Sequence, residues 1–571
     1  MSKFPVSRSL NPGSSPNFRE LFTPKLVTVL REGYGLAQLR ADAIAGLTVA
    51  IVALPLSMAI AIASGVSPDR GVYTAIVGGF LVSLLGGSRF QIGGPAGAFI
   101  ILVAASVQRH GIDGLVLATA MSGVMLMIAG YLRLGTYIKF IPYPVTVGFT
   151  AGIAVIIFAS QLRDLFGLRL DDPEPGALVE KLGVLASVAD TLNPQALLVA
   201  VGTIAIIVIT KRLRPNWPGM LIAIAFVSIA TTLLTLDVET IGSRFGGIPR
   251  TLPLPVLPEF SLAKAQAVLP DAIAFTLLGA IESLLSAVVA DGMTGRRHRS
   301  NCELVAQGVA NIGAAFVGGV PVTGTIARTA TNVRSGSVGP VSGLLHAVFL
   351  LLFMLIAAPL ASYIPLAALA GLLAVVAWNM VEKSAISSLL RSSWGDAAVV
   401  SITFLLVIFR DLTEGIVVGF ALGALLFIHR MATTIVVEED VPDSAETTPA
   451  VHEAEAATQS NTSVYRVSGA FFFGAAATVG TVLDGIIGRD GNFVLDFSKT
   501  PLIDSTAANV VESVARKAQR AGVRMFITGT SPSVRQTLIA NGVRAPLVTY
   551  EPTIAAALDQ LRNVPLRSSP Y

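Results

Sequence analysis

An internal repeat, interrupted at a matching point in each copy, constrains this chain more than any other feature of its sequence. The tetrapeptide Asp-Ala-Ile-Ala at residues 42–45 recurs at residues 271–274, an offset of 229 residues. A Gly-Gly-Pro element at 93–95 matches Gly-Gly-Val-Pro at 318–321, and the prolines of the two elements lie 226 residues apart. Each element interrupts an apolar run. Two halves with broken hydrophobic segments at corresponding positions are typical of membrane transporters that bind their substrate at the breaks.

The composition excludes a soluble globular protein as the main interpretation. Hydrophobic residues make up 53% of the chain and charged residues 13%, and the mean hydropathy is +0.71. The single cysteine, Cys302, excludes a disulfide framework, and the five scattered histidines form no cluster with metal-ligand spacing. The sequence therefore predicts neither a metal site nor a cofactor. The net charge of +4 is spread over short loops, which argues against a nucleic-acid partner.

The apolar runs predict an α-helical polytopic membrane protein of fourteen segments, arranged as two inverted repeats of seven. A full crossing needs ~20 apolar residues, and the two segments that begin at the breaks are too short for one. An odd number of segments per copy inverts the second copy relative to the first. The predicted segments are 42–64, 70–88, 94–109, 113–132, 143–163, 195–212, 217–236, 270–291, 303–320, 322–333, 340–361, 364–381, 396–410 and 412–430.

Basic residues in alternate loops predict the orientation of the membrane domain. Cytosolic loops carry an excess of Lys and Arg, and here the even-numbered loops are the basic ones. We therefore expect a cytosolic tail over 1–39, a transmembrane transport domain over 40–435, and both termini on the cytosolic side. The basic residues of these loops are Arg89, Arg133, Lys139, Lys211, Arg212, Arg214, Arg296, Arg297, Arg299, Arg334, Lys383 and Arg391.

The character of the chain changes after the last apolar segment. Residues 436–461 are acidic and rich in Ala, Thr and Ser, which predicts a linker. A small α/β domain follows over 462–571. Period-two and helical patterns predict strands at 463–467, 493–497 and 524–528, and helices at 505–520, 534–541 and 553–561.

Two charged residues inside apolar segments need an explanation. Glu282 lies well inside the eighth segment, where an ionisable side chain costs at least ~2.5 kcal/mol, and Arg328 lies on the second broken segment. One interpretation is an ion pair that only ties the two halves together. The other is a role in a transport site, because Arg328 lies at the break and Glu282 lies on the segment that opens the same repeat.

The breaks also predict the charge of the ligand. A helix that starts within the membrane presents unpaired N–H groups and a partial positive charge at its N-terminus, and Arg328 adds a full charge. Thr323, Thr325 and Thr329 supply hydroxyl groups at the second break, whereas the first break offers only backbone around Ala96 and Gly97. We therefore expect a small inorganic or organic anion.

Several of these residues resemble the sulfate permease (SulP) family of anion transporters. The similarity covers about 40–565. The tail, with Val-Leu-Asp-Phe-Ser at 494–498 and Ile-Asp-Ser-Thr at 503–506, is similar to the STAS domain that ends most members. The membrane motifs are the run 42–55, Gly-Val-Ser-Pro at 65–68, Gly94-Pro95, the run 140–149, and Arg328-Thr329 with Asn332.

The resemblance implies a core and a gate that move as an elevator, in a homodimer, in the inner (plasma) membrane. It places the substrate at Ala96 and Gly97 and at Thr325, Ile326, Ala327 and Arg328, with coupling through Glu282 and Ser286. The stretches 281–285 and 291–295 look similar to the branch with a proton-coupled C4-dicarboxylate transporter. A related sodium-coupled bicarbonate branch carries Asp and Thr where this chain has Glu282 and Ser286, which favours a proton over sodium.

The predicted function is therefore secondary-active transport of sulfate or a C4-dicarboxylate, and the chain is not expected to be an enzyme. A sodium-coupled bicarbonate transporter, a nucleobase permease of similar architecture and an anion channel are the alternatives. Relatives that carry sulfate often have Pro-Gln where this chain has Pro55 and Leu56, and often a hydroxyl residue where it has Ala96. In the STAS domain, Ser505 is either a regulatory phosphorylation site or only the N-cap of a helix.

Overall fold

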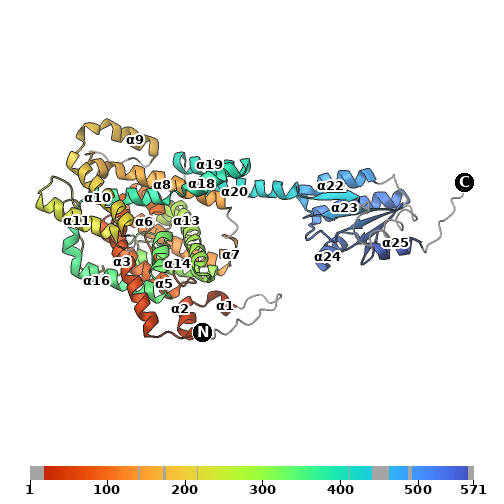
Figure 1. Ribbon diagram of the computed structural model, residues 1–571, viewed down its shortest axis with the longest axis horizontal. Helices are drawn as coiled ribbons and strands as arrows, with labels where there is room; N and C mark the ends of the chain where they lie inside the picture. Colours follow the sequence, from red (N-terminus) through yellow and green to blue (C-terminus); the bar gives the residue numbers. More distant parts are fainter. Residues whose placement is uncertain are drawn as a thin grey trace. The chain divides into compact units, whose positions relative to one another are not determined.

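The computed structural model of the chain describes residues 18–138, 142–170, 175, 177–214, 217–410, 412–439, 462–486 and 492–562. They belong to two compact units, and the boundary between Phe420 and Ala421 falls inside one long helix (Figure 1). Residues 1–17 of the predicted cytosolic tail and 440–461 of the predicted linker lie outside the described residues.

The larger unit is helical, and each predicted segment has helical structure at its position. Eight of its helical spans, in the part of the chain that the structure describes, are long and apolar enough to cross a membrane. The elements at the predicted segments are α3 (Leu36–Ala63), α4 (Pro68–Tyr73) with α5 (Gly79–Leu85), α6 (Ile100–Tyr131), α8 (Tyr143–Phe166), α10 (Pro194–Leu213), α11 (Gly219–Leu233), α13 (Leu262–Thr294), α14 (Ser300–Phe316), α15 (Ile326–Arg334), α16 (Val341–Ala361), α17 (Leu366–Met380), α19 (Trp394–Phe409) and α20 (Leu412–Ala432).

Short helices cap or connect these elements. They are α1 (Phe18–Phe22), α2 (Lys25–Glu32), α7 (Gly135–Ile138), α9 (Leu178–Ser187), α12 (Ile241–Phe245) and α18 (Lys383–Ser392). The predicted segments 94–109 and 113–132 form α6 together, with a kink between them. Gly111 makes the kink with φ 68° and ψ −173°, a backbone conformation that favours glycine. A single π-helical turn, Thr74–Gly78, joins α4 to α5.

The two breaks lie side by side. Strand β1 (Gly93–Gly94) pairs antiparallel with strand β2 (Thr323–Gly324), with Gly93 opposite Gly324. The N–H group of Thr325 extends the ladder by donating to the carbonyl of Ile92 at 3.1 Å. Two short strands that interrupt helices within a membrane satisfy each other's backbone groups, which lipid cannot do. The two copies of the repeat therefore meet at their interruptions, as the sequence predicts.

The repeated aspartates explain how each broken segment is held at its far end. Asp42 Oδ1 accepts backbone N–H groups at residues 338–339, at 2.6 and 3.2 Å. Its counterpart Asp271 binds Arg109 at 2.5 Å and lies 3.7 Å from the imidazole of His110. These partners differ by the same 229 residues that separate the two aspartates. Each copy of the repeat thus anchors the end of the other copy's broken segment.

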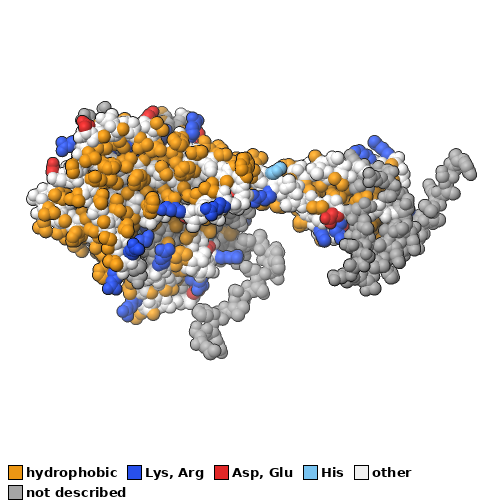
Figure 2. Space-filling model, turned by 45° about the horizontal axis from the view of Figure 1, so that its top comes forward, with side chains coloured by type: hydrophobic (Ala, Val, Ile, Leu, Met, Phe, Trp, Pro, Cys, Tyr) orange, Lys and Arg blue, Asp and Glu red, His pale blue; other side chains and the backbone are white. Residues whose placement is uncertain are grey.

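The surface of the larger unit suits a bilayer. Hydrophobic side chains cover much of the face in Figure 2, and Lys and Arg side chains lie along its margins. Large apolar side chains such as Leu198, Phe226 and Ile356 are 60 to 77% exposed. A water-soluble unit seldom exposes so large a continuous apolar surface. The predicted fold class, a polytopic helical membrane protein, is confirmed.

The smaller unit is an α/β fold around a five-stranded sheet of order β3-β4-β5-β6-β7. Strands β4 to β7 run parallel, and β3 pairs antiparallel with β4 at one edge. Two hydrophobic clusters fill the spaces between sheet and helices. The strands are β3 (Val436–Glu439), β4 (Thr462–Ser468), β5 (Asn492–Asp496), β6 (Arg524–Thr528) and β7 (Thr549–Tyr550), and the helices α22 (Phe473–Ile486), α23 (Ser505–Arg520), α24 (Pro532–Ala540) and α25 (Ile554–Arg562).

Most predicted elements of the smaller unit coincide with observed ones, and two differences have physical causes. The first four residues of the predicted linker, 436–439, form the edge strand β3, because an edge strand tolerates exposed acidic side chains. Helix α22 is absent from the prediction because its Ala-, Gly- and Thr-rich sequence has little helical periodicity. Its burial of Ala476, Val479 and Leu483 against the sheet holds it in place instead.

Candidate functional site

Arg328 is the charge at the centre of the candidate site. Its side chain is buried at 2% exposure, and Nη2 donates to Ser57 Oγ at 3.1 Å and to the carbonyl of Pro95 at 3.2 Å. Nε and Nη1 have no acceptor among the residues that the structure describes. A buried guanidinium with free N–H groups is costly in the absence of a counter-charge. Arg328 is therefore positioned to bind an anion.

The glycines of the two strands make room for the arginine. A Cβ at Gly94 would collide with Nη1 of Arg328, and a Cβ at Gly324 would collide with the amide of Gln91. Side chains therefore lie directly against the backbone of both strands. The guanidinium occupies its position at the break only because residue 94 has no side chain.

We expect the Gly94→Ala substitution to weaken anion binding, because the added methyl group displaces the guanidinium. Overpacking of this kind costs ~1–3 kcal/mol, and roughly tenfold in affinity for each 1.4 kcal/mol. Anion binding measured by thermal shift tests this. Gly202→Ala on α10 is the control, since a Cβ there meets nothing within 4 Å. Equal anion affinity in the two variants would contradict the role of Gly94.

Both half-helices begin at the strands with unsatisfied N-termini. The first starts at the 3-10 turn Gly97–Phe99 and continues into α6, and the second is α15. Their N-cap residues, Ala96 and Thr325, are extended and cap neither helix through a side chain. The N–H groups of the first turns, including those of Ile326 and Ala327, remain available for an anion. Ala327 is exposed although it lies at this depth of the chain.

The three threonines of the second break have different roles. Thr323 donates to the carbonyl of Gly279 at 3.1 Å, and Thr329 Oγ1 accepts the N–H group of Ile92 at 3.2 Å. Both are held in the structure. The hydroxyl of Thr325 is buried without a partner among the described residues. Thr325 is therefore the threonine that remains available to a ligand.

Glu282 and Ser286 lie on the face of α13 that packs against the second break. Ser286 donates to Thr329 at 3.0 Å, and Gly279, three residues before Glu282, accepts from Thr323. Positions 279, 282 and 286 share one side of a helix. Glu282 is 7% exposed, and no described residue forms an ion pair or hydrogen bond with its carboxylate. The alternative in which Glu282 and Arg328 only pair with each other is therefore wrong.

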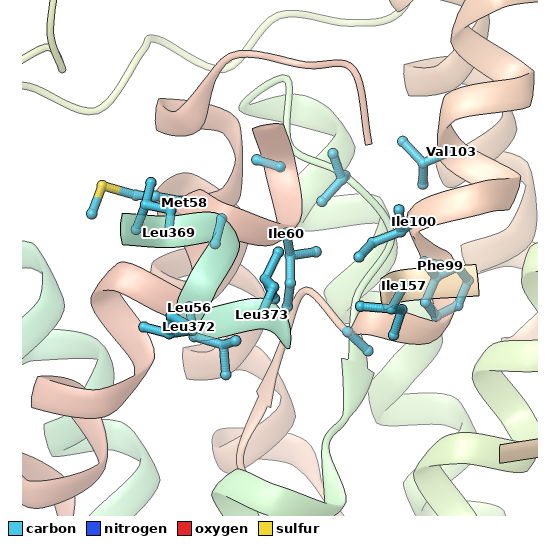
Figure 3. Packing of buried hydrophobic residues seen from close by; sticks show 14 of the residues in the cluster. Leu56, Met58, Ile60, Phe99, Ile100, Val103, Ile157, Leu369, Leu372 and Leu373 are labelled. Atoms are coloured by element: carbon cyan, nitrogen blue, oxygen red, sulfur yellow. The ribbon is translucent and has the colours of Figure 1, made fainter. Parts of the chain in front are cut away.

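Apolar side chains form the wall opposite the break. We call the mutually packed helices α8, α10, α11, α17 and α19 the gate bundle. Figure 3 shows Ile157 of α8 and Leu369, Leu372 and Leu373 of α17 among residues from α3 and the start of α6. A Cβ at Gly97 would come within 2.9 Å of Ile157. The gate bundle thus contributes apolar contacts, and the polar groups of the site come from the broken segments and α3.

A cavity of about 320 Å³ lies beside this wall, at the end of the unit where α3 ends. It extends from Ile100 and Ile101, at the start of α6, to Arg163 and Arg244. Arg244 pairs with Asp164 at 3.0 Å. The cavity does not include Arg328. It reaches only the first of the two breaks.

Ser505 belongs to the smaller unit. It is exposed at the first position of α23, and the N-cap is Asp504, whose carboxylate accepts the N–H groups of Ala507 at 2.8 Å and Phe473 at 3.0 Å. The interpretation of Ser505 as the N-cap is therefore wrong. Its hydroxyl projects beside a capped helix start, and its regulatory role stays a prediction.

Ser57 is the site residue that sequence reasoning missed. It lies within α3, two residues after Pro55, and is fully buried. The signal was a hydroxyl residue in the middle of an otherwise apolar segment, where it commonly bonds its own helix backbone. Ser57 does so, donating to the carbonyl of Ala53 at 2.7 Å, and in addition accepts from Arg328.

Comparison with known proteins settles the family. Residues 39–403 match the Sulfate permease family, and residues 453–557 match the STAS domain. The chain belongs to the sulfate permease family. This confirms the resemblance seen in the sequence. As a sulfate permease family member with a STAS domain, the chain is an anion transporter and not an enzyme.

Individual relatives span nearly the whole of this sulfate permease family member. The putative sulfate transporter YvdB of Bacillus subtilis is 38% identical over 520 residues, covering 90% of this chain and 95% of YvdB. The bicarbonate transporter BicA of Picosynechococcus is 29% identical, covering 88% of this chain and 90% of BicA. Among solved structures, the murine Slc26a9 anion transporter in the inward-facing state has a TM-score of 0.82 at 18% identity, with 98 and 100% coverage. That likeness shows the fold.

Proposed function

We propose that this protein is a secondary-active transporter that takes up sulfate or a C4-dicarboxylate together with a proton. The anion binds between the two breaks, at Ala96, Gly97, Thr325, Ile326, Ala327 and Arg328. One observation carries the proposal: Arg328 is buried beside two uncapped helix N-termini, with two guanidinium nitrogens free. The core moves relative to the gate bundle as an elevator. The protein works as a homodimer in the plasma membrane, with both termini cytosolic.

The charge balance of the site supports an anion over a neutral ligand. An uncompensated buried ion costs several kcal/mol, and a bound anion removes that cost while it satisfies the free N–H groups. A nucleobase offers no full negative charge to Arg328. The donors, two backbone N-termini, one hydroxyl and one guanidinium, suit the oxygen atoms of sulfate or a carboxylate.

The relatives support more than one substrate. YvdB is named as a putative sulfate transporter, which supports sulfate. The similarity to BicA supports bicarbonate as a second candidate. The C4-dicarboxylate proposal rests on the sequence around Glu282. The apolar wall of the gate bundle is compatible with the methylene groups of a dicarboxylate, since it offers them hydrophobic contact.

Coupling is proposed to run through Glu282 with Ser286 beside it. An uncompensated carboxylate at this depth is costly, and a proton removes its charge. A bound anion increases the local negative charge and favours that proton further. By linkage, the proton raises the affinity for the anion by the same factor.

A counterflow experiment tests the substrate class. Full-length protein in liposomes loaded with unlabelled sulfate should accumulate labelled sulfate, with saturable competition by sulfate or by succinate and fumarate, and weaker competition by chloride and uracil. Strong competition by bicarbonate together with a sodium requirement would favour the second candidate. Flux that does not saturate and shows no counterflow would indicate a channel and contradict the proposal.

A further inference from the structure

All tryptophans of this chain lie at one end of the gate bundle. The sequence contains three, Trp217, Trp378 and Trp394, and they are 60, 67 and 83% exposed. Trp217 precedes α11, Trp378 lies in the last turn of α17, and Trp394 begins α19. Their loops are the even-numbered ones that the charge pattern predicts to be cytosolic. Exposed tryptophans of a membrane protein are typical of the interface between lipid tails and water.

Two lysines from different repeats flank Trp378. Lys383 Nζ lies 3.3 Å from the centroid of the indole ring, and Lys211 Nζ donates to Asn379 Oδ1 at 3.3 Å. Both lysines are exposed. We call Lys211, Trp217, Trp378, Lys383 and Trp394 the basic rim.

The surroundings of the basic rim add positive charge and apolar surface. Arg212 and Arg391 are exposed on α10 and α18, and Leu390 of α18 is 50% exposed. The neighbouring carboxylate of Glu382 accepts the hydroxyl of Tyr143 at 3.2 Å. Helix α18 has no buried residue, so it lies on the surface of the unit.

We propose that the basic rim binds the headgroup of an anionic phospholipid. The indole of Trp378 lies at the depth of the glycerol backbone, and the two ammonium groups bind the phosphate and the anionic headgroup. Each lysine near an anionic membrane surface contributes roughly a fivefold preference, equivalent to ~1 kcal/mol. A lipid held there fixes the depth of the gate bundle while the core moves.

Quenching of tryptophan fluorescence tests this directly. In full-length protein, Trp217→Phe with Trp394→Phe leaves Trp378 as the sole reporter. The protein is reconstituted into bilayers in which either the phosphatidylglycerol or the phosphatidylcholine carries bromine in its chains, at equal content. Brominated phosphatidylglycerol should quench several-fold more strongly. Adding Lys211→Gln and Lys383→Gln should make the two lipids quench equally.

The control removes equal charge from the same predicted face. Arg296→Gln with Arg297→Gln affects two exposed arginines of the loop after α13, and it should leave the lipid preference unchanged. Equal quenching by both lipids in the reporter protein overturns the proposal, as does a preference that persists without the two lysines. Inorganic phosphate should reduce the preference no more than chloride at equal ionic strength. A larger effect of phosphate would assign the site to free phosphate and overturn the lipid.

Discussion

Replacing Arg328 with alanine abolishes measurable anion binding while the protein still folds. Removing one member of a buried charged contact costs ~2–5 kcal/mol, which is roughly 30-fold or more in affinity. The anion-free protein should not lose stability, because the substitution removes an uncompensated buried charge. Thermal unfolding with and without sulfate measures both effects. The wild type should be stabilised by the anion, and Arg328→Ala should unfold at the same temperature with or without it.

Two further variants make this test specific. Arg334→Ala removes an exposed arginine from the other end of α15 and should keep the stabilisation by sulfate. Arg328→Lys keeps the charge but loses the two-pronged contact with Ser57 and Pro95, so it should bind with intermediate affinity. Full sulfate stabilisation in a folded Arg328→Ala protein would remove the anion site from this position.

Replacing Glu282 with glutamine uncouples uptake from the proton. In the wild type, uptake should rise as the pH falls, because the proton that neutralises Glu282 and the anion favour each other's binding. Glutamine imitates the protonated carboxyl group at every pH. Glu282→Gln should therefore lose the acid stimulation and the accumulation driven by a pH gradient, while exchange of one anion for another continues. Uptake into liposomes at a series of external pH values measures the difference.

Glu303 provides the matched control for that experiment. It is fully buried on α14, but its carboxylate accepts the N–H group of Ser88 at 2.9 Å and the amide of Gln307 at 3.0 Å. Its charge is therefore held by the structure. Glu303→Gln should lower the thermal stability and leave the pH profile of uptake unchanged. If Glu282→Gln retains the wild-type pH profile, another group carries the proton.

The membrane fold follows from the sequence because hydrophobic length and Gly/Pro interruptions are local signals. A helix in lipid must satisfy its own backbone, so an apolar run of sufficient length predicts a span. The merging of two predicted segments into α6 depends on a single φ angle at Gly111, which the hydropathy pattern does not encode. The same reasoning applies to β3, whose acidic residues look like those of a linker until a neighbouring strand pairs with them.

The candidate site was predictable in its residues but not in its contacts. The sequence placed Arg328, Thr325 and Glu282 near one another through the repeat. Whether Glu282 pairs with Arg328 depends on the side of α13 that faces the break and on the direction of two side chains. The same uncertainty hid Ser57, because a buried serine usually bonds its own helix backbone.

The crossed aspartate anchors also determine when this protein can complete its fold during synthesis. Asp42 and strand β1 are made early, but their partners at residues 338–339 and in β2 emerge almost 300 residues later along the chain. The first half therefore enters the membrane with an open strand and an unanchored broken helix. The polar groups of both breaks stay unpaired until the second half arrives. The anion site is thus a late product of biogenesis, and a chain truncated before the second break contains none of it in finished form.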